Sequence, residues 1–337
     1  MDWHWAINMK RVLTGITTTG IPHLGNYIGA IKPSIAESND DGIKSYFFLA
    51  DYHALIKSHD PQLIRESSLK IAATWLALGL SDRSSFYRQS DIPEIFELTW
   101  ILTCFTAKGL MNRAHAYKAA ADLNIEDGND VDKAITMGLY SYPILMSADI
   151  LMFKANEVPV GKDQVQHVEM TRDIALRFNH NYGNILTIPE VVTNHSQETI
   201  IGLDGRKMSK SYNNIIPIFL EEKPLRKLIN KIKTNSLEPG VPKEYKDCTL
   251  FALYAYFATS EEIESIKKLY AEGISWGDMK SILFEKIFNF FDPYRSTYTD
   301  YLSDEAFLEK RLRLGGEQAR EEASAYLKEI KSAIGIK

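Results

Sequence analysis

The stretch RVLTGITTTGIPHLGNYIGAI, residues 11–31, joins a short β-strand pattern to a helix start and indicates the fold. Its first residues are mostly β-branched or apolar, and the strand is expected to end at Gly15. A loop of small hydroxyl residues follows, and Pro22 with His23 is expected to open a helix. The free N–H groups of a helix start favour phosphate oxygens. A glycine-rich turn that only packs tightly is the alternative, and the stretch is neither a Walker loop nor the dinucleotide fingerprint.

Three more β-rich runs, at 45–50, 84–89 and 157–161, are each followed by a loop and a stretch with helical spacing. This alternation is typical of a parallel sheet covered by helices, as in Rossmann-like α/β proteins. The third interval between runs is nearly twice as long as the others, which predicts a helical insertion at about 91–156.

The strand patterns stop after residue 215, and the remaining chain is predicted to be helical. We therefore expect a Rossmann-type domain over 9–222 and an all-helical C-terminal domain over 223–337. The last helix is expected to pack back on the first domain.

Composition restricts the kind of protein. The chain has 337 residues, 45% of them hydrophobic, and a formal net charge of -5, so nucleic-acid contacts must be confined to local basic patches. Two distant cysteines cannot build a disulfide framework or a four-thiolate metal site. Neither a signal peptide nor a membrane span is indicated, and we expect a cytoplasmic protein.

The segment GLDGRKMSKSYNN, residues 202–214, places Lys207 and Lys210 around small hydroxyl residues on a glycine-containing loop. A solvated surface loop is one interpretation. The other is a loop that closes over a polyphosphate, where the two ammonium groups stabilise a departing pyrophosphate in the transition state.

Together, HLGN at 23–26 and KMSKS at 207–211 resemble the two signatures of class I aminoacyl-tRNA synthetases, in the right order. Further stretches are similar to the tryptophan-specific branch of that class, and the resemblance extends from about Met9 to the C-terminus. These stretches are GNYIGAI (25–31), ADYHALI (50–56), YPILMSADILMF (142–153) and VPVGKDQVQHVEMTRDIALRFN (158–179).

The resemblance implies a reaction and a set of site residues. Tryptophan and ATP would form an adenylate, and the tRNA would then accept the amino acid. The implied catalytic residues are His23, Asn26, Lys207 and Lys210. The implied ATP-binding residues are Thr17, Thr18, Thr19, Gly25, Asn26, Gly29, Gly161, Lys162, Asp163, Ile200, Lys207, Met208, Ser209, Lys210 and Ser211. The implied tryptophan-binding residues are Leu13, Gly15, His53, Tyr142, Met146, Asp149, Val158, Val160 and Gln164.

Two of these positions depart from the family pattern. Thr17 stands where many relatives have glutamine, and Lys162 stands where an acidic residue is common. The departures bear on the contacts to the bound carboxylate and to the ribose.

Asp149 follows Met146, Ser147 and Ala148 on an apolar helix, where a carboxylate is costly unless something donates to it. An indole N–H is such a donor, and phenylalanine would leave the buried acceptor unpaired. A core acid with a protein partner is the alternative. His53, His115 and His167 are more typical of hydrogen-bonded core residues, although His53 follows a strand where open sheets bind ligands.

The implied partners are tRNA(Trp), L-tryptophan, ATP with Mg²⁺, and a second copy of the chain in a homodimer. No protein-held metal site is indicated. The C-terminal domain is expected to bind the tRNA anticodon region, and one of its helices carries a cationic face of Lys223, Arg226, Lys227, Lys231 and Lys233. Three alternatives stay open: a tyrosine-specific enzyme, a small-molecule nucleotidyltransferase, and a binding or regulatory paralogue without catalysis.

Overall fold

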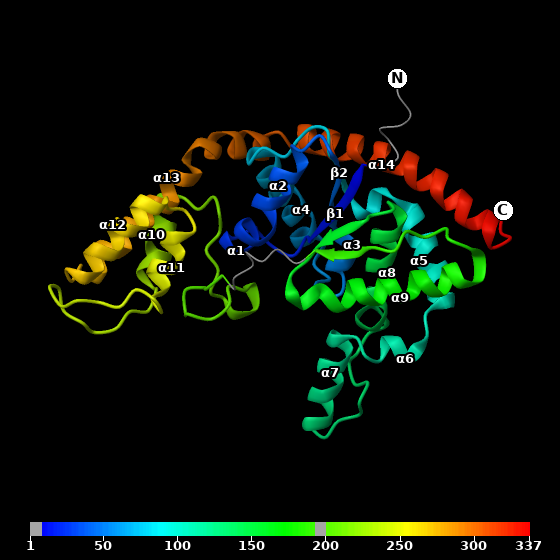
Figure 1. Cartoon of the computed structure of the whole chain (residues 1–337), viewed down its shortest axis with the longest axis horizontal. Coiled ribbons are helices and arrows are strands. Elements are labelled where there is room, and N and C mark those ends of the chain that lie inside the picture. Colours follow the sequence, from blue (N-terminus) through cyan, green and yellow to red (C-terminus); the bar gives the residue numbers. More distant parts are fainter. Residues whose placement is uncertain (1–8, 193–199) are drawn as a thin grey trace.

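The chain forms a five-stranded parallel sheet flanked by helices, with a helical region at one end (Figure 1). The computed structural model describes residues 9–192 and 200–337. The strand order is β3-β2-β1-β4-β5, so the order reverses between β1 and β4. The strands are β1 Lys10–Thr17, β2 Ile43–Ala50, β3 Ser85–Arg88, β4 Glu157–Pro159 and β5 Glu190–Val192.

The predicted fold class, a Rossmann-like parallel sheet followed by helices, is confirmed. β5, a strand of three residues, was not predicted from the sequence patterns. β1 and β2 pair over their full lengths, whereas the register of β1 with β4 contains the single pair Val12↔Glu157. β1 and β4 therefore diverge toward their carboxyl ends, where open sheets bind ligands.

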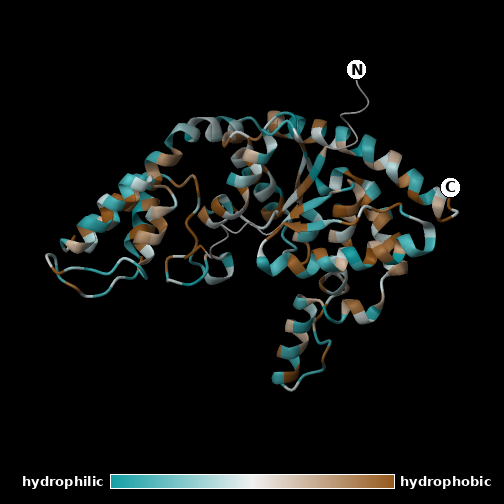
Figure 2. Cartoon of the chain, in the orientation of Figure 1, coloured by the Kyte–Doolittle hydropathy of each residue, from teal (hydrophilic) through white to brown (hydrophobic). Residues whose placement is uncertain are grey.

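Alternating side chains of β2 build two cores on opposite faces of the sheet. Tyr46 and Phe48 belong to a core with the insertion helices, while Phe47 and Leu49 belong to a core with the C-terminal helices. Both faces are therefore covered, as expected for a parallel sheet. Hydrophobic colour gathers on the central strands in Figure 2, and the peripheral helices carry hydrophilic outer faces.

Helices and helical turns connect the strands. Those of the first half are α1 Leu24–Asn26, η1 Tyr27–Ile31, α2 Lys32–Ser38, α3 Asp51–Ala54, α4 Pro61–Ala77, η2 Gln89–Asp91, α5 Pro93–Phe105, α6 Lys108–Met111, α7 His115–Glu126, α8 Met137–Met152, η3 Lys162–Gln164 and α9 Val165–Tyr182. Those after the sheet are η4 Lys210–Tyr212, α10 Glu222–Asn230, α11 Thr249–Ala255, α12 Ser260–Ala271, α13 Trp276–Ser303 and α14 Glu305–Ala333.

The insertion between β3 and β4 contains α5 to α8, and α7 projects away from the sheet (Figure 1). α5 and α8 pack against each other and against α9, so the inner insertion helices belong to the sheet core. α8 ends beside the amino end of β1, where the Phe153 carbonyl accepts from Arg11 Nε at 2.8 Å.

α13 and α14 run across the molecule and end beside the sheet (Figure 1). α14 contacts β3 closely because Gly315 has no side chain: a Cβ atom there would lie 1.9 Å from the carbonyl oxygen of Phe86. Glu322 of α14 also accepts from Lys44 at 2.6 Å and from Tyr46 at 2.9 Å. The C-terminal helix is thus attached directly to the edge and the amino ends of the central strands.

Candidate active site

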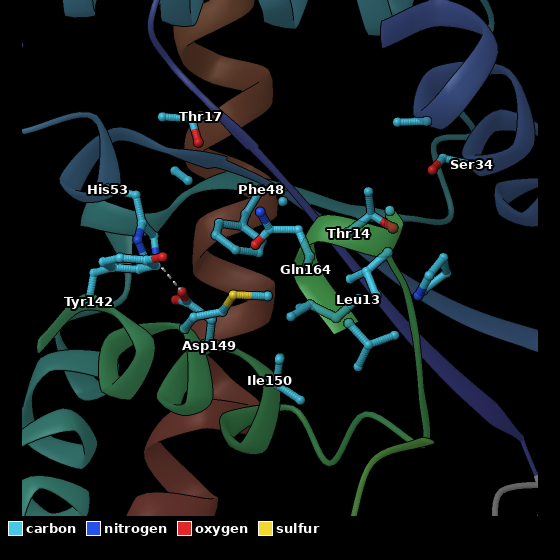
Figure 3. A pocket seen from close by; sticks show the side chains of 18 of the residues that line it. Leu13, Thr14, Thr17, Ser34, Phe48, His53, Tyr142, Asp149, Ile150 and Gln164 are labelled. Carbon is cyan, nitrogen blue, oxygen red and sulfur yellow. Dashed lines mark hydrogen bonds and ion pairs between the residues drawn. The ribbon is translucent and has the colours of Figure 1, made fainter. Parts of the chain in front are cut away.

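A cavity of about 410 Å³ opens at the carboxyl ends of β1, β2 and β4, at the point where the strand order reverses. Its walls come from β1, α2, α3, α8 and the turn after β4 (Figure 3). All nine residues that the sequence predicts to bind tryptophan line it, namely Leu13, Gly15, His53, Tyr142, Met146, Asp149, Val158, Val160 and Gln164.

Asp149 is the buried acid of this cavity, with 1% of its surface exposed. Its Oδ2 lies 3.0 Å from His53 Nε2, and the side-chain amide of Gln89 donates to both carboxylate oxygens at 2.9 Å. Burial raises the pKa of Asp149, although the hydrogen bonds from His53 and Gln89 act in the opposite direction. The acid therefore has protein partners and also faces the cavity.

The wall opposite the acid is apolar. Leu13 and Val158 are buried, and Phe48, which the sequence analysis did not select, adds an aromatic ring. Gly15 makes room for that ring, because a Cβ atom there would lie 2.4 Å from Phe48 Cζ. An acid at one side and flat apolar surfaces at the other suit an aromatic ring with one N–H donor.

Tyr142 and Gln164 complete the cavity near its opening. The Tyr142 hydroxyl lies 2.7 Å from His167 Nε2, behind the cavity wall. Burial, with a smaller contribution from His115, lowers the pKa of His167 to about 4, so this ring is neutral near pH 7. Gln164 donates to Asp163 at 3.2 Å. His53 thus lines the cavity directly, whereas His167 contacts the lining residue Tyr142.

The HLGN turn is attached to the chain that follows the lysine loop. Leu24 N–H donates to the Ile216 carbonyl at 2.9 Å, and Ile218 N–H donates to the Pro22 carbonyl at 3.2 Å. His23 lies between them, 6% exposed, and burial together with the charge of Lys210 lowers its pKa to about 4. The imidazole is therefore a neutral donor near pH 7.

The KMSKS segment lies against the same turn. The Met208 sulfur accepts from Gly25 N–H at 3.3 Å, and the Met208 N–H donates to the Ile200 carbonyl at 2.7 Å. Lys210 Nζ donates to the Thr19 carbonyl at 2.9 Å. Lys207 Nζ lies 3.8 Å from an oxygen of Asp163. The two lysines thus contact the first loop and the turn after β4, each close in sequence to residues that line the cavity, Thr17 and Gly161.

The Lys210 side chain is exposed to solvent but is partly desolvated by the protein around it. This partial desolvation, together with the nearby charge of Lys57, lowers the pKa of Lys210 to about 8. Lys57 itself lines the cavity and was not selected from the sequence. Positive side chains gathered in this way favour an anionic ligand.

Only some of the remaining predicted ATP-binding residues line the cavity. Thr17, Gly29 and Gly161 line the cavity, whereas Thr18 is fully buried behind it. The hydroxyls of Ser209 and Ser211 lie 2.8 Å from each other. Lys162 is exposed.

Within 9–192 and 200–337, no group of three or more His, Cys, Asp or Glu side chains has the arrangement of a metal site. A search of the same residues finds no helix long and apolar enough to span a membrane.

Comparison with known proteins agrees with the geometry. The family described as tRNA synthetases class I (W and Y) matches residues 8–292. The tryptophan–tRNA ligase of Neisseria meningitidis is 53% identical over 333 residues, which are 98% of this chain and 99% of that protein. A tryptophan–tRNA ligase of Pseudomonas putida is 53% identical over 331 residues, covering 97% of this chain and 74% of that protein.

Solved structures give the same result. The tryptophanyl-tRNA synthetase of Campylobacter jejuni complexed with ADP and tryptophan has a TM-score of 0.88 at 40% identity, and the match covers 97% of this chain and all of that one. A tyrosyl-tRNA synthetase of Aeropyrum pernix matches with a TM-score of 0.65 at 19% identity, which shows a shared fold alone.

The chain belongs to the class I tRNA synthetases that act on tryptophan and tyrosine. Within that class, its full-length relatives place it among the tryptophanyl-tRNA synthetases.

Proposed function

We propose that the cavity joins tryptophan to ATP, and that the residues around its mouth stabilise the reacting phosphates. The chain is an aminoacyl-tRNA synthetase that attaches tryptophan to tRNA, as its relatives over nearly the full length support. The observation that carries the residue assignment is the position of Asp149 inside a cavity that Thr17 and Gly161 also line, each two residues from the partners of Lys210 (Thr19) and Lys207 (Asp163).

The first step is attack of the tryptophan carboxylate on the α-phosphate of ATP, with pyrophosphate leaving on the opposite side. His23 and Asn26 lie at the helix start and donate to phosphate oxygens, while Lys207 and Lys210 bind the β- and γ-phosphates. Alignment and charge stabilisation supply most of the acceleration in such transfers, so a protein nucleophile is not required. Mg²⁺ arrives with ATP, held mainly by phosphate oxygens and water.

Tryptophan is selected by its ring nitrogen. The indole N–H donates to Asp149, while Leu13, Met146, Val158 and Val160 enclose the ring. Phenylalanine fits the apolar walls but leaves the cavity-facing acceptor position of the buried carboxylate without a donor, a defect that reaches discrimination of roughly 10⁴ in comparable sites. Tyr142 and Gln164 bind the ammonium group of the amino acid.

In the second step the terminal ribose of tRNA(Trp) displaces AMP, and class membership implies attack by the 2′-hydroxyl. The helices from 223 to 337 are proposed to bind the anticodon region. Of their cationic residues, Arg226 stacks over the Phe284 ring at 3.8 Å and is 3.4 Å from Glu222. The proposal also includes a homodimer and a cytoplasmic location.

ATP–pyrophosphate exchange measured with each proteinogenic amino acid tests the proposal, followed by charging of tRNA. Tryptophan alone is expected to drive exchange and to be attached to tRNA. Exchange driven by tyrosine would mean that tyrosine, not tryptophan, is the amino-acid substrate. Exchange without charging of tRNA would indicate a nucleotidyltransferase, and the absence of exchange would indicate a binding paralogue without catalysis. Lys210→Met provides the matched inactive enzyme, which should keep tryptophan binding while losing exchange.

A further inference from the structure

Gln89 is a fully buried residue that the mechanism above does not use. It begins the helical turn η2 directly after β3 and does not line the cavity. Its side-chain amide nevertheless donates to both oxygens of Asp149, at 2.9 Å each, from the side away from the cavity.

We propose that Gln89 is a positioning residue for tryptophan selection: it holds the Asp149 carboxylate so that an oxygen faces the incoming indole N–H. The inference rests on the proposed function, because it takes Asp149 as the acceptor of that N–H. Gln89 acts through Asp149 and does not touch the substrate.

A neutral amide is suited to this task. It stabilises a buried carboxylate by hydrogen bonds. A lysine or arginine in its place would neutralise the charge that attracts the indole N–H. His53, on the cavity side of the same carboxylate, is the second partner at 3.0 Å. The two partners leave the carboxylate little rotational freedom, so the acceptor is preorganised before tryptophan binds.

The orientation of the Gln89 amide agrees with this role. Its Oε1 is buried without a hydrogen-bond partner among the described residues, while its Nε2 faces the acid. The reverse orientation would place two acceptors against each other. A buried acceptor without a partner is costly, so a site that required only packing would be served better by an apolar side chain.

The turn that carries Gln89 is itself held in place. Ser90 N–H donates to Asp51 at 3.1 Å, and the Arg88 N–H donates to Asp91 at 3.1 Å. α14 packs against this turn, where a Cβ atom at Gly316 would lie 2.9 Å from Asp91 Cβ. The amide of Gln89 is therefore fixed by its backbone as well as by its partner.

The test compares Gln89→Met, which keeps the length of the side chain, with Gln89→Glu, which keeps its shape and adds a second acid. Gln62→Met, at an exposed position of α4, is the matched control. The KM for tryptophan is expected to rise about ten- to a hundredfold in both Gln89 variants, because Met removes the hydrogen bond to the buried charge and Glu places an acid there that shares a proton with Asp149. The KM for ATP and the Gln62 control should stay unchanged.

The decisive readout is the ratio of kcat/KM for tryptophan to that for its benzothiophene analogue, which has sulfur in place of the ring N–H. This ratio does not depend on the fraction of folded enzyme, so it remains informative if a variant is unstable. It should fall in both Gln89 variants by about the same factor as in Asp149→Asn. A ratio unchanged in the Gln89 variants but lowered in Asp149→Asn would overturn the role of Gln89 alone. If Asp149→Asn also leaves the ratio unchanged, the result would contradict the proposed role of Asp149 as well as that of Gln89.

Discussion

The pKa of Lys210 allows the phosphate site to be tested by pH. Its value of about 8 means that the side chain is mostly charged at pH 7 and mostly neutral at pH 9. Because only the ammonium form attracts phosphate, kcat/KM for ATP should be full below the pKa and be lost as the pH rises through it. The expected decline is about tenfold per pH unit above the midpoint.

Other groups near the phosphates do not produce this decline. His23 has a pKa of about 4 and stays neutral throughout the range. The last ionisation of a phosphate group has a pKa of about 6, so the γ-phosphate of ATP can only gain negative charge as the pH rises, which would strengthen its attraction to a cation. The Lys57→Met variant removes the neighbouring positive charge and should therefore move the midpoint to higher pH.

The assay is ATP–pyrophosphate exchange at saturating tryptophan, followed from about pH 6.5 to 9.5. Lys328→Met on the exposed face of α14 controls for the loss of a lysine. A profile that stays flat through this range, or a midpoint that is the same with and without Lys57, would refute the assignment of Lys210.

Three further predictions address the acid, the fold and the loop. Asp149→Asn should raise the KM for tryptophan by about ten- to a hundredfold, since a charge-assisted hydrogen bond contributes about 1.5–3 kcal/mol. Asp173→Asn, at an exposed position, is the control and should leave this KM unchanged. A wild-type KM in both variants would contradict the assignment of Asp149. Gly315→Ala should lower the free energy of unfolding in urea by about 1–3 kcal/mol, because the new methyl group would lie 1.9 Å from a carbonyl oxygen of β3. Gly109→Ala, where the added atom meets open space, is its control, and equal stability of the two variants would be the failing result. Lys207→Met should slow single-turnover adenylate formation by about 10², and a wild-type rate would exclude this side chain from the transition state.

The parts of the fold and site that depend on residues close together in the sequence could be predicted from the sequence. β1 and β2 have long β-rich runs that lie within the observed strands, although β1 extends to Thr17 and does not end at Gly15 as expected. HLGN and KMSKS are contiguous signatures, and Asp149 stands out as an acid within an apolar helix. All nine residues of the expected tryptophan set lie around one cavity for the same reason, since their neighbours in sequence carry the resemblance.

The features that the sequence did not predict, β5, Gln89 and Phe48, depend on contacts between segments that are distant in the chain. β5 was not recognised as a β-rich run, and it is a strand because β4 pairs with it. Gln89 resembles a polar residue at a strand end until the fold places Asp149 beside it, 60 positions further along the chain. Phe48 looks like any apolar strand residue in the sequence, and its ring fits beside the cavity because Gly15 has no Cβ atom.

A crystal structure with tryptophan and a non-hydrolysable ATP analogue tests the central claim most directly. We expect the indole nitrogen about 2.9 Å from a carboxylate oxygen of Asp149, and the ammonium groups of Lys207 and Lys210 on the phosphates of the same complex. An indole ring bound away from Asp149, or both lysines directed into solvent while the analogue is bound, would contradict it.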